Sequence, residues 1–287
     1  MLASAQIFDA MPPAIRSMLF VSGEKPERFP KALAAGADLV CIDLEDAVAP
    51  SLKQQARQDV FAFAAAPRAA GRLAVRLNAL RTREGLADVA ALLASGARFD
   101  AIVLPKVEHA QDLALFHAWT ADRDEMLVAL IESPLGIENA SSIAAAARSG
   151  APRLGALMLG GADLSSELGA SFDWDGLLSA RGRLVNAART AGLQAWDVPH
   201  IDLRDLDALA EETRRVARLG FDCKSAIHPS QIPGIHAAFA PAEADLRWAR
   251  ALLAAHGDAS EGAFLFEGRM VDAPVIARAR RIVALAA

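Results

Sequence analysis

Aromatic residues and cysteines are scarce in this sequence. It contains no tyrosine and 2 cysteines among 287 residues, and aromatic side chains make up 6% of the chain. Hydrophobic residues make up 53%, which excludes a largely disordered protein and predicts an aliphatic, alanine-rich core suited to packing helices on a sheet. Cys41 and Cys223 lie far apart in apolar runs, so we expect two buried thiols rather than a disulfide.

Long apolar runs and long basic runs are also missing. No stretch approaches the roughly 20 consecutive apolar residues of a membrane-spanning helix. The 30 basic and 35 acidic residues give a net charge of −5, so we expect no nucleic-acid partner. Residues 1–13 include Asp9 and no basic segment, which does not predict a secretory signal. We therefore expect a cytoplasmic protein that does not contact membranes.

Short apolar runs alternate with helix-like stretches along most of the chain. Consecutive apolar positions are typical of parallel strands that are covered on both faces. The runs are residues 17–21, 39–44, 73–77, 101–104, 126–131, 156–159, 193–198 and 225–227. The predicted helices between them include residues 26–35, 52–65, 83–94, 137–149 and 205–219. Gly36, Gly96 and Gly220 lie just beyond three of these helices, as expected of helix C-termini.

Eight strands alternating with helices predict an α/β fold, the (β/α)8 TIM barrel, over residues 16–240. An open doubly wound sheet is disfavoured because the first turn lacks a GxGxxG pattern. Residues 1–15 form a lead-in, and residues 241–287 exceed what one barrel helix requires. We interpret the latter as a C-terminal helical extension, with helices at 241–255 and from Ala273 and a glycine-punctuated segment at 257–268.

Polar side chains follow nearly every predicted strand. TIM-barrel active sites lie at the C-terminal ends of the strands. The residues at these positions are Asp43, Glu45, Asp46, Arg76, Asn78, Lys106, Glu132, Asp163, Asp197 and His228. Crowded carboxylates raise one another's pKa unless cations neutralise them. We therefore expect either a divalent cation or a set of basic side chains among these acidic residues, of which Arg76 and Lys106 supply two charges and leave the rest for a metal.

The available ligands indicate which metal to expect. Histidine and cysteine do not cluster at useful spacing, which disfavours zinc. Glu132 and Asp163, with waters and substrate completing an octahedron, are typical of Mg²⁺, for which Mn²⁺ can substitute. The alternative is that either carboxylate forms a structural ion pair with a barrel arginine.

Eight short segments carry a resemblance to a known family. They are residues 16–21 (RSMLFV), 43–48 (DLEDAV), 75–78 (VRLN), 104–108 (LPKVE), 130–133 (LIES), 161–164 (GADL), 227–231 (IHPSQ) and 268–274 (GRMVDAP). In this order they resemble the citrate lyase β-subunit-like branch of the HpcH/HpaI aldolase superfamily, close to malyl-CoA and citramalyl-CoA lyases. The resemblance runs from about Arg16 to the C-terminus. It implies a magnesium-dependent lyase that cleaves a malyl-, methylmalyl- or citramalyl-CoA to an acyl-CoA and a 2-oxo acid.

The resemblance also implies roles for individual residues. Glu132 and Asp163 resemble the magnesium ligands, and Arg76 resembles the group that holds the thioester oxygen as the enolate forms. Asp272 resembles an acid/base aspartate that the tail delivers to a neighbouring subunit in trimeric or hexameric members. For Asp272 the alternative is a helix N-cap, because Pro274 follows in the first turn.

Further residues are expected around this site. We expect Gly161, Ala162 and Asp163 to bind the substrate carboxylate through main-chain amides. Glu45 and Asp46 are expected to orient metal-bound water or to pair with Arg16, with a purely structural ion pair as the alternative.

Lys106 is expected to form an ion pair at the barrel floor rather than a Schiff base, and His228 to be structural. Lys25 and Arg28 are expected either to meet CoA phosphates or to be solvated. Two other activities stay open: a 3-hydroxyacyl-CoA thioesterase on the same site, and a citryl lyase β subunit that works with an acyl carrier protein.

Overall fold

The chain divides into two compact units, Met1–Ile235 and His236–Ala287. The structure is a computed structural model that describes residues 15–68, 70–257 and 263–285. Residues 1–14 of the predicted lead-in lie outside the described residues. No helix in the described part of the chain has the length and apolar character needed to cross a membrane.

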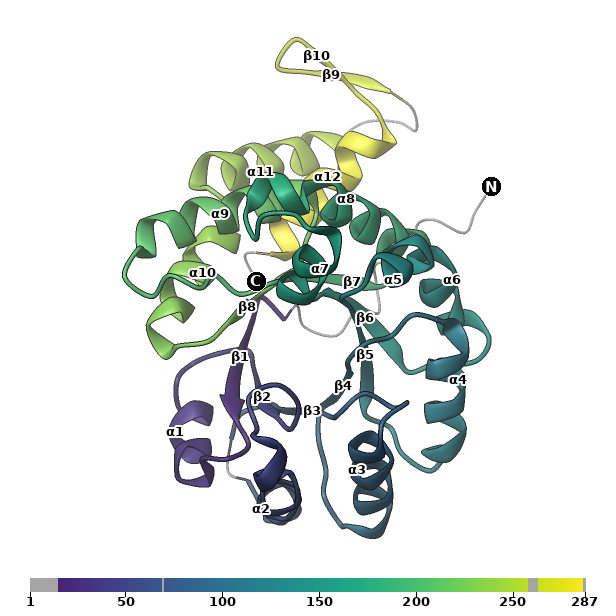
Figure 1. Cartoon of the computed structure of the whole chain (residues 1–287). Coiled ribbons are helices and arrows are strands. Elements are labelled where there is room, and N and C mark those ends of the chain that lie inside the picture. The colour runs from purple at the N-terminus through teal and green to yellow at the C-terminus, as the bar shows by residue number, and fades with distance from the viewer. Residues whose placement is uncertain (1–14, 69, 258–262, 286–287) are drawn as a thin grey trace. The chain divides into compact units, whose positions relative to one another are not determined.

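Eight parallel strands close into a barrel in the first unit (Figure 1). They are β1 (Ser17–Ser22), β2 (Leu39–Asp43), β3 (Leu73–Arg76), β4 (Ala101–Leu104), β5 (Met126–Ile131), β6 (Leu154–Leu159), β7 (Gln194–Asp197) and β8 (Cys223–Ala226). Each strand pairs with the next, and β8 pairs with β1. The predicted TIM barrel is confirmed, with strand ends within two residues of the predicted ones.

Helices follow the strands and cover the outside of the barrel (Figure 1). They are α1 (Phe29–Leu33), α2 (Lys53–Ala65), α3 (Arg83–Ala94), α4 (Ala110–Trp119), α5 (Pro134–Glu138), α6 (Ala140–Ala145), α7 (Gly161–Leu168), α8 (Trp174–Ala191) and α9 (Leu206–Leu219). The next helix, α10 (Ile232–Phe239), contains the boundary between the two units. Gly220 ends α9 in the left-handed conformation, with φ 108°. The same expectation for Gly96 is wrong, because α3 ends at an extended Ser95 instead.

Alternate residues of the strands point into the barrel and form its core. The buried cluster, which includes both cysteines as free thiols, is Ile15, Met18, Leu39, Cys41, Ala74, Ala101, Val103, Val128, Leu130, Ala156, Met158, Trp196 and Cys223. Successive residues of a strand face opposite sides. The next inward positions at the ends of β2, β3, β5 and β6 are therefore Asp43, Arg76, Glu132 and Gly160. The period of the strands brings these four residues to one end of the barrel interior.

Outward positions of β7 and β8 carry a buried charge network. Lys224 Nζ lies 2.9 Å from Asp197 Oδ2 and 3.0 Å from Glu212 Oε1, and Arg181 Nε of α8 lies 2.9 Å from Asp197 Oδ1. Burial alone would raise the pKa of Asp197, but Lys224 and Arg181 lower it below its usual value. Asp197 thus faces the helices. The expectation that it belongs to the barrel mouth is wrong because the inward residue of this strand is its neighbour Trp196.

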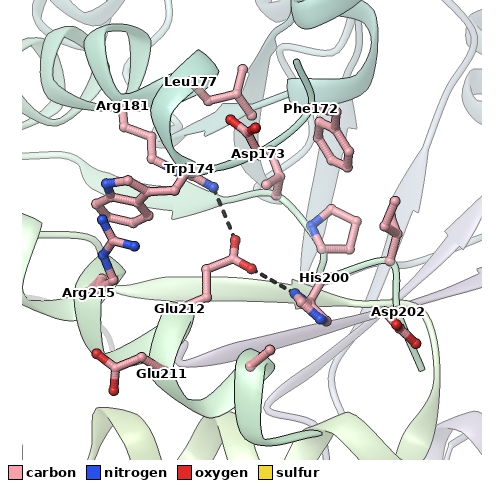
Figure 2. A pocket seen from close by; sticks show the side chains of 14 residues that line it. Phe172, Asp173, Trp174, Leu177, Arg181, His200, Asp202, Glu211, Glu212 and Arg215 are labelled. Atoms are coloured by element: carbon pink, nitrogen blue, oxygen red, sulfur yellow. Dashed lines mark hydrogen bonds and ion pairs between the residues drawn. The ribbon is translucent and has the colours of Figure 1, made fainter. Parts of the chain in front are cut away.

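Glu212 extends this network to a cavity of about 380 Å³ beside α8, α9 and the segment after β7 (Figure 2). Its carboxylate forms a hydrogen bond with His200 Nδ1 at 2.7 Å. The indole of Trp174 stacks against Arg215, whose Cζ lies 4.0 Å from the ring centroid, and also against Arg181 at 4.8 Å. These contacts fix the outer wall of the barrel behind β7.

The second unit consists of a helix pair and a hairpin. Its elements are α11 (Glu243–Gly257), β9 (Phe264–Phe266), β10 (Arg269–Val271) and α12 (Ala273–Ala284). Leu252, Val271, Ile276 and neighbouring alanines form a core of its own. The hairpin occupies the end of the predicted glycine-punctuated segment, and residues 258–262 of that segment lie outside the described residues.

Replacing Asp197 by asparagine should destabilise the barrel strongly. Asp197→Asn leaves the buried Lys224 and Arg181 with one counter-charge fewer, and breaking a buried pair costs about 3–5 kcal/mol. Urea unfolding of the variant measures this loss in the free energy of unfolding. The control is Glu27→Gln, which removes an exposed partner of Arg28 and should change stability by less than about 0.5 kcal/mol. Equal effects of the two substitutions would contradict the prediction.

Candidate functional site

Arg76, the last residue of β3, is held by Asp43, the last residue of β2. The strand register places the two residues side by side. Arg76 Nε lies 2.7 Å from Asp43 Oδ1 and Nη2 lies 2.6 Å from Oδ2. The remaining nitrogen, Nη1, lies 2.9 Å from Glu45 Oε2 and 3.6 Å from Asp46 Oδ2. Burial acts to lower the pKa of Arg76, but Asp43, Glu45 and Asp46 raise it above its usual value, so the guanidinium stays charged.

Glu132 follows β5 and is only 4% exposed. Its Oε1 accepts a hydrogen bond of 2.8 Å from the main-chain N–H of Lys106. Lys106 has a left-handed backbone with φ 55°, which is uncommon for a residue with a side chain and often marks a functional site. Burial raises the pKa of Glu132, and the charge and N–H group of Lys106 partly offset this.

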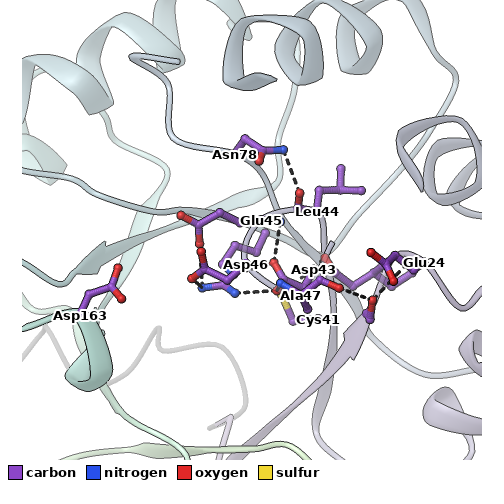
Figure 3. A network of polar contacts seen from close by, with 12 residues as sticks. Glu24, Cys41, Asp43, Leu44, Glu45, Asp46, Ala47, Asn78 and Asp163 are labelled. Carbon is purple, nitrogen blue, oxygen red and sulfur yellow. Dashed lines mark hydrogen bonds and ion pairs between the residues drawn. The ribbon is translucent and has the colours of Figure 1, made fainter. Parts of the chain in front are cut away.

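The ammonium of Lys106 lies among carboxylates from three parts of the barrel. It pairs with Asp163 of α7, and it lies 3.7 Å from Glu132 Oε1 and 3.9 Å from Glu45 Oε1. The expectation that Lys106 pairs at the barrel floor is wrong, because its side chain leaves from the C-terminal end of β4. Figure 3 shows Asp163 together with Asp43, Glu45 and Asp46 at this mouth.

Arg16 lies at the opposite end of the barrel. It precedes β1, and its Nε and Nη2 lie 3.0 Å and 3.1 Å from the carboxylate of Asp38, which precedes β2. A strand of five or six residues is roughly 17–20 Å long. The expected pairing of Arg16 with Glu45 or Asp46 is therefore wrong. Arg16 lies at the N-terminal end of β1, whereas Glu45 and Asp46 follow the C-terminal end of β2, one strand length away.

Gly160 and Gly161 connect β6 to α7, and each is required by a close contact. A Cβ atom on Gly160 would lie 2.3 Å from the Cβ of Glu132 and 2.6 Å from its Oε2. A Cβ atom on Gly161 would lie within 2.8 Å of Phe172 and Val198 side-chain atoms. Only glycine lets the chain pass Glu132 and start α7 at this place.

The N-terminus of α7 lies at the mouth. Gly161, Ala162 and Asp163 form its first turn, where main-chain N–H groups have no partner within the helix and favour an anion. The Asp163 side chain is 39% exposed. The turn therefore offers amide donors directly beside a carboxylate that solvent and substrate can reach.

Three other groups of the sequence interpretation have contacts of their own. Asp272 belongs to the second unit, where its Oδ1 accepts a long hydrogen bond of 3.4 Å from the N–H of Val275 at the start of α12. His228 caps the short 3-10 turn Pro229–Gln231 and bonds with Ser230 Oγ at 2.8 Å. Lys25 and Arg28 are exposed. The N-cap expected as an alternative for Asp272 is present.

The partner of Arg76 was missed by the sequence interpretation. Asp43 was placed at a strand end but given no role, although it is 2% exposed and accepts two hydrogen bonds from the Arg76 guanidinium. The signal was present in the strand period, because Asp43 and Arg76 both stand two residues beyond an inward residue on neighbouring strands.

The acidic residues of the mouth fit a magnesium ion that uses few protein ligands. Among the residues that the structure describes, no three His, Cys, Asp or Glu side chains form a ready-made metal cage. Mg²⁺ commonly takes only one or two carboxylates and keeps several waters. Glu132 and Asp163 supply two carboxylates, and the ammonium of Lys106 between them marks a place where a cation is favoured.

Glu45 should make the stability of the metal-free protein depend on pH. Burial raises the pKa of Glu45 from 4.5 to about 8, although Arg76 opposes the shift. Between these pH values the folded chain keeps a proton that the unfolded chain has released. The free energy of unfolding should therefore fall as the pH rises from about 4.5 to 8, and level off above.

Urea unfolding in EDTA across this pH range tests the effect. Glu45→Gln should reduce the slope, whereas Glu27→Gln, which alters an exposed partner of Arg28, should keep the slope of the wild type. An unchanged slope in Glu45→Gln would contradict the assignment.

Comparisons with known proteins show the family of the chain. The family description HpcH/HpaI aldolase/citrate lyase matches residues 16–229. A citrate lyase subunit beta-like protein of Mycobacterium tuberculosis is 39% identical over 272 residues, which cover 92% of this chain and 93% of the relative. The mitochondrial citramalyl-CoA lyase of Rattus norvegicus is 30% identical, covering 94% of this chain and 86% of the relative.

A solved structure extends the likeness to three dimensions. The crystal structure of CitE from Mycobacterium tuberculosis, in complex with magnesium, acetoacetate and coenzyme A, matches with a TM-score of 0.81 at 37% identity. The match covers 95% of this chain and 98% of that one. The chain is therefore a carbon–carbon lyase that belongs to the HpcH/HpaI aldolase/citrate lyase family.

Proposed function

We propose that this protein is a magnesium-dependent lyase that cleaves a 3-hydroxyacyl-CoA of the malyl-, methylmalyl- or citramalyl-CoA type to an acyl-CoA and a 2-oxo acid. The observation that carries the proposal is the Arg76 guanidinium, held by buried Asp43 at the mouth that Glu132 and Asp163 share. The rat relative is named a citramalyl-CoA lyase, and the mycobacterial structure contains magnesium and coenzyme A. Both names support the substrate class.

Arg76 provides a positive charge that this reaction requires. The bond between the hydroxyl-bearing carbon and the α-carbon of the thioester breaks, and its electron pair enters the thioester fragment as an enolate. The hydroxyl loses its proton to water, and its carbon becomes the carbonyl of the 2-oxo acid. A guanidinium that stays protonated and is held in place stabilises the enolate oxygen. Asp43 holds two of its nitrogens and so fixes its plane.

Glu132 and Asp163 would hold magnesium at the mouth, and Mn²⁺ should replace it. Bound there, the ion supplies positive charge to the hydroxyl and carboxylate oxygens of the substrate and lowers the pKa of the hydroxyl. The amides of Gly161, Ala162 and Asp163 donate to the substrate carboxylate. The ammonium of Lys106 lies 3.9 Å from Glu45 Oε1 beside this site.

Asp272 of a neighbouring subunit returns a proton to the enolate carbon in this proposal. The side chain is exposed, and the single long hydrogen bond to Val275 leaves Oδ2 available. A homotrimer or hexamer would place one subunit's second unit at the next subunit's barrel, and CoA rather than an acyl carrier protein would carry the substrate. We propose a cytoplasmic location for this enzyme.

Product analysis tests the proposed reaction. With Mg²⁺, the purified protein should convert malyl-CoA to acetyl-CoA and glyoxylate, or citramalyl-CoA to acetyl-CoA and pyruvate, as measured by mass spectrometry. Glu132→Gln and Asp163→Asn should each lower the rate at least about 100-fold, whereas Glu27→Gln should not. Free CoA without a 2-oxo acid would instead indicate a thioesterase. Absence of turnover on both substrates would favour a carrier-dependent β subunit.

Mixing two inactive variants tests the shared site. Asp272→Ala and Arg76→Ala each remove one half of every site. In randomly mixed cyclic oligomers about one quarter of the sites join an intact Arg76 to an intact Asp272 of the neighbour. The mixture should therefore recover about that fraction of wild-type activity, and each variant alone should recover none. No recovery in oligomers shown to be mixed would contradict the role of Asp272.

A further inference from the structure

Lys53, the first residue of α2, turns its ammonium back toward the barrel mouth. Its Nζ donates to the main-chain carbonyls of Leu44 at 2.8 Å and Glu45 at 2.7 Å, and to Asn78 Oδ1 at 2.7 Å. Three acceptors satisfy all three N–H groups of the ammonium. Lys53 therefore joins the segment after β2 to the segment after β3, whereas a lysine on a barrel helix ordinarily extends into solvent.

Asn78 completes the connection from the other side. It lies two residues beyond Arg76 and is 5% exposed. Its Nδ2 donates to Leu44 O at 2.9 Å and to Asp88 Oδ2 at 2.7 Å (Figure 3 shows the first of these bonds). Asp88 is buried on α3 and accepts a hydrogen bond of 2.6 Å from Arg57 of α2. The chain of bonds thus anchors the mouth to two helices outside the barrel.

The segment after β2 carries a charged group of the site, and the segment after β3 directly follows Arg76. Glu45 follows Leu44, and its carboxylate lies 2.9 Å from Arg76 Nη1 and 3.9 Å from Lys106 Nζ. We propose that Lys53 and Asn78 are positioning residues, which fix the main chain of residues 44–45 and thereby hold the Glu45 carboxylate against Arg76. The inference rests on the proposed lyase function and adds two residues that act through Arg76 and Glu45 without touching substrate.

The N–H groups and the carbonyls of the segment after β2 are held by different partners. The N–H of Leu44 donates to Arg76 O at 2.9 Å, and the N–H groups of Glu45 and Ala47 donate to the Asp43 carboxylate. The Leu44 carbonyl accepts from both Lys53 and Asn78. If the ammonium is lost, the Glu45 carbonyl keeps only the N–H of Val48 at 3.0 Å. A misplacement of about 1 Å in a catalytic group costs about 100-fold in rate. A small movement of this segment therefore acts on catalysis more than on folding.

Lys53→Met tests the proposal, because it keeps the length of the side chain and removes the ammonium. The kcat for carbon–carbon cleavage should fall about 10- to 100-fold, with the KM for the acyl-CoA within about twofold of wild type. Arg123→Met is the matched control. It removes a buried cation that bonds to Glu125 and to the Ala97 carbonyl before β5 and β4, at the other end of the barrel. It should lower thermal stability and leave kcat unchanged.

Amide hydrogen exchange gives a second readout that needs no activity. The amides of residues 45–48 should exchange faster in Lys53→Met and in Asn78→Ala than in wild type or Arg123→Met. Asn78→Ala serves in place of Lys53→Met if the latter does not fold. Unchanged exchange in the tested variants, or a loss of kcat no larger than in Arg123→Met, would overturn the inference. If the wild type cleaves no substrate, the proposed function fails, and exchange alone decides whether residues 44–45 are held by these bonds.

Discussion

The ion pair between Asp43 and Arg76 is the interaction on which the rest of the site depends. The two residues end neighbouring strands, and Asp43 binds two nitrogens of the guanidinium while it also accepts the N–H groups of Glu45 and Ala47. One buried carboxylate therefore fixes both the cation and the turn that brings Glu45 to it. Because desolvation offsets much of the attraction in a buried pair, its main contribution is orientation rather than stability.

Much of the fold and part of the site can be predicted from the short apolar runs of the sequence. Parallel strands that are covered on both faces consist of consecutive apolar residues, and these runs predicted the barrel. The same runs do not say which residues point inward, because both faces are apolar. Arg76 and Glu132 were placed correctly at the mouth, while Asp197, one residue away from the inward Trp196, was not. Arg16 was misplaced for a different reason. It precedes β1 and therefore lies at the N-terminal end of the strand, whereas the mouth is at the C-terminal end.

Other parts of the site were beyond the reach of the sequence. The left-handed backbone of Lys106 and the contact between Gly160 and Glu132 depend on how β4, β5 and β6 meet at the mouth. Lys53 looks in the sequence like any lysine in the first turn of a helix. Its role depends on how α2 lies against the ends of β2 and β3. Such contacts arise from tertiary packing, for which a single sequence carries no local pattern.

The ammonium of Lys106 among the mouth carboxylates has a consequence for the order of folding and metal binding. Many small domains whose metal ligands carry uncompensated negative charge fold only when the ion is bound. Here the polypeptide carries its own counter-cation to Glu132 and Asp163. A newly synthesised chain can thus complete its barrel before any ion arrives.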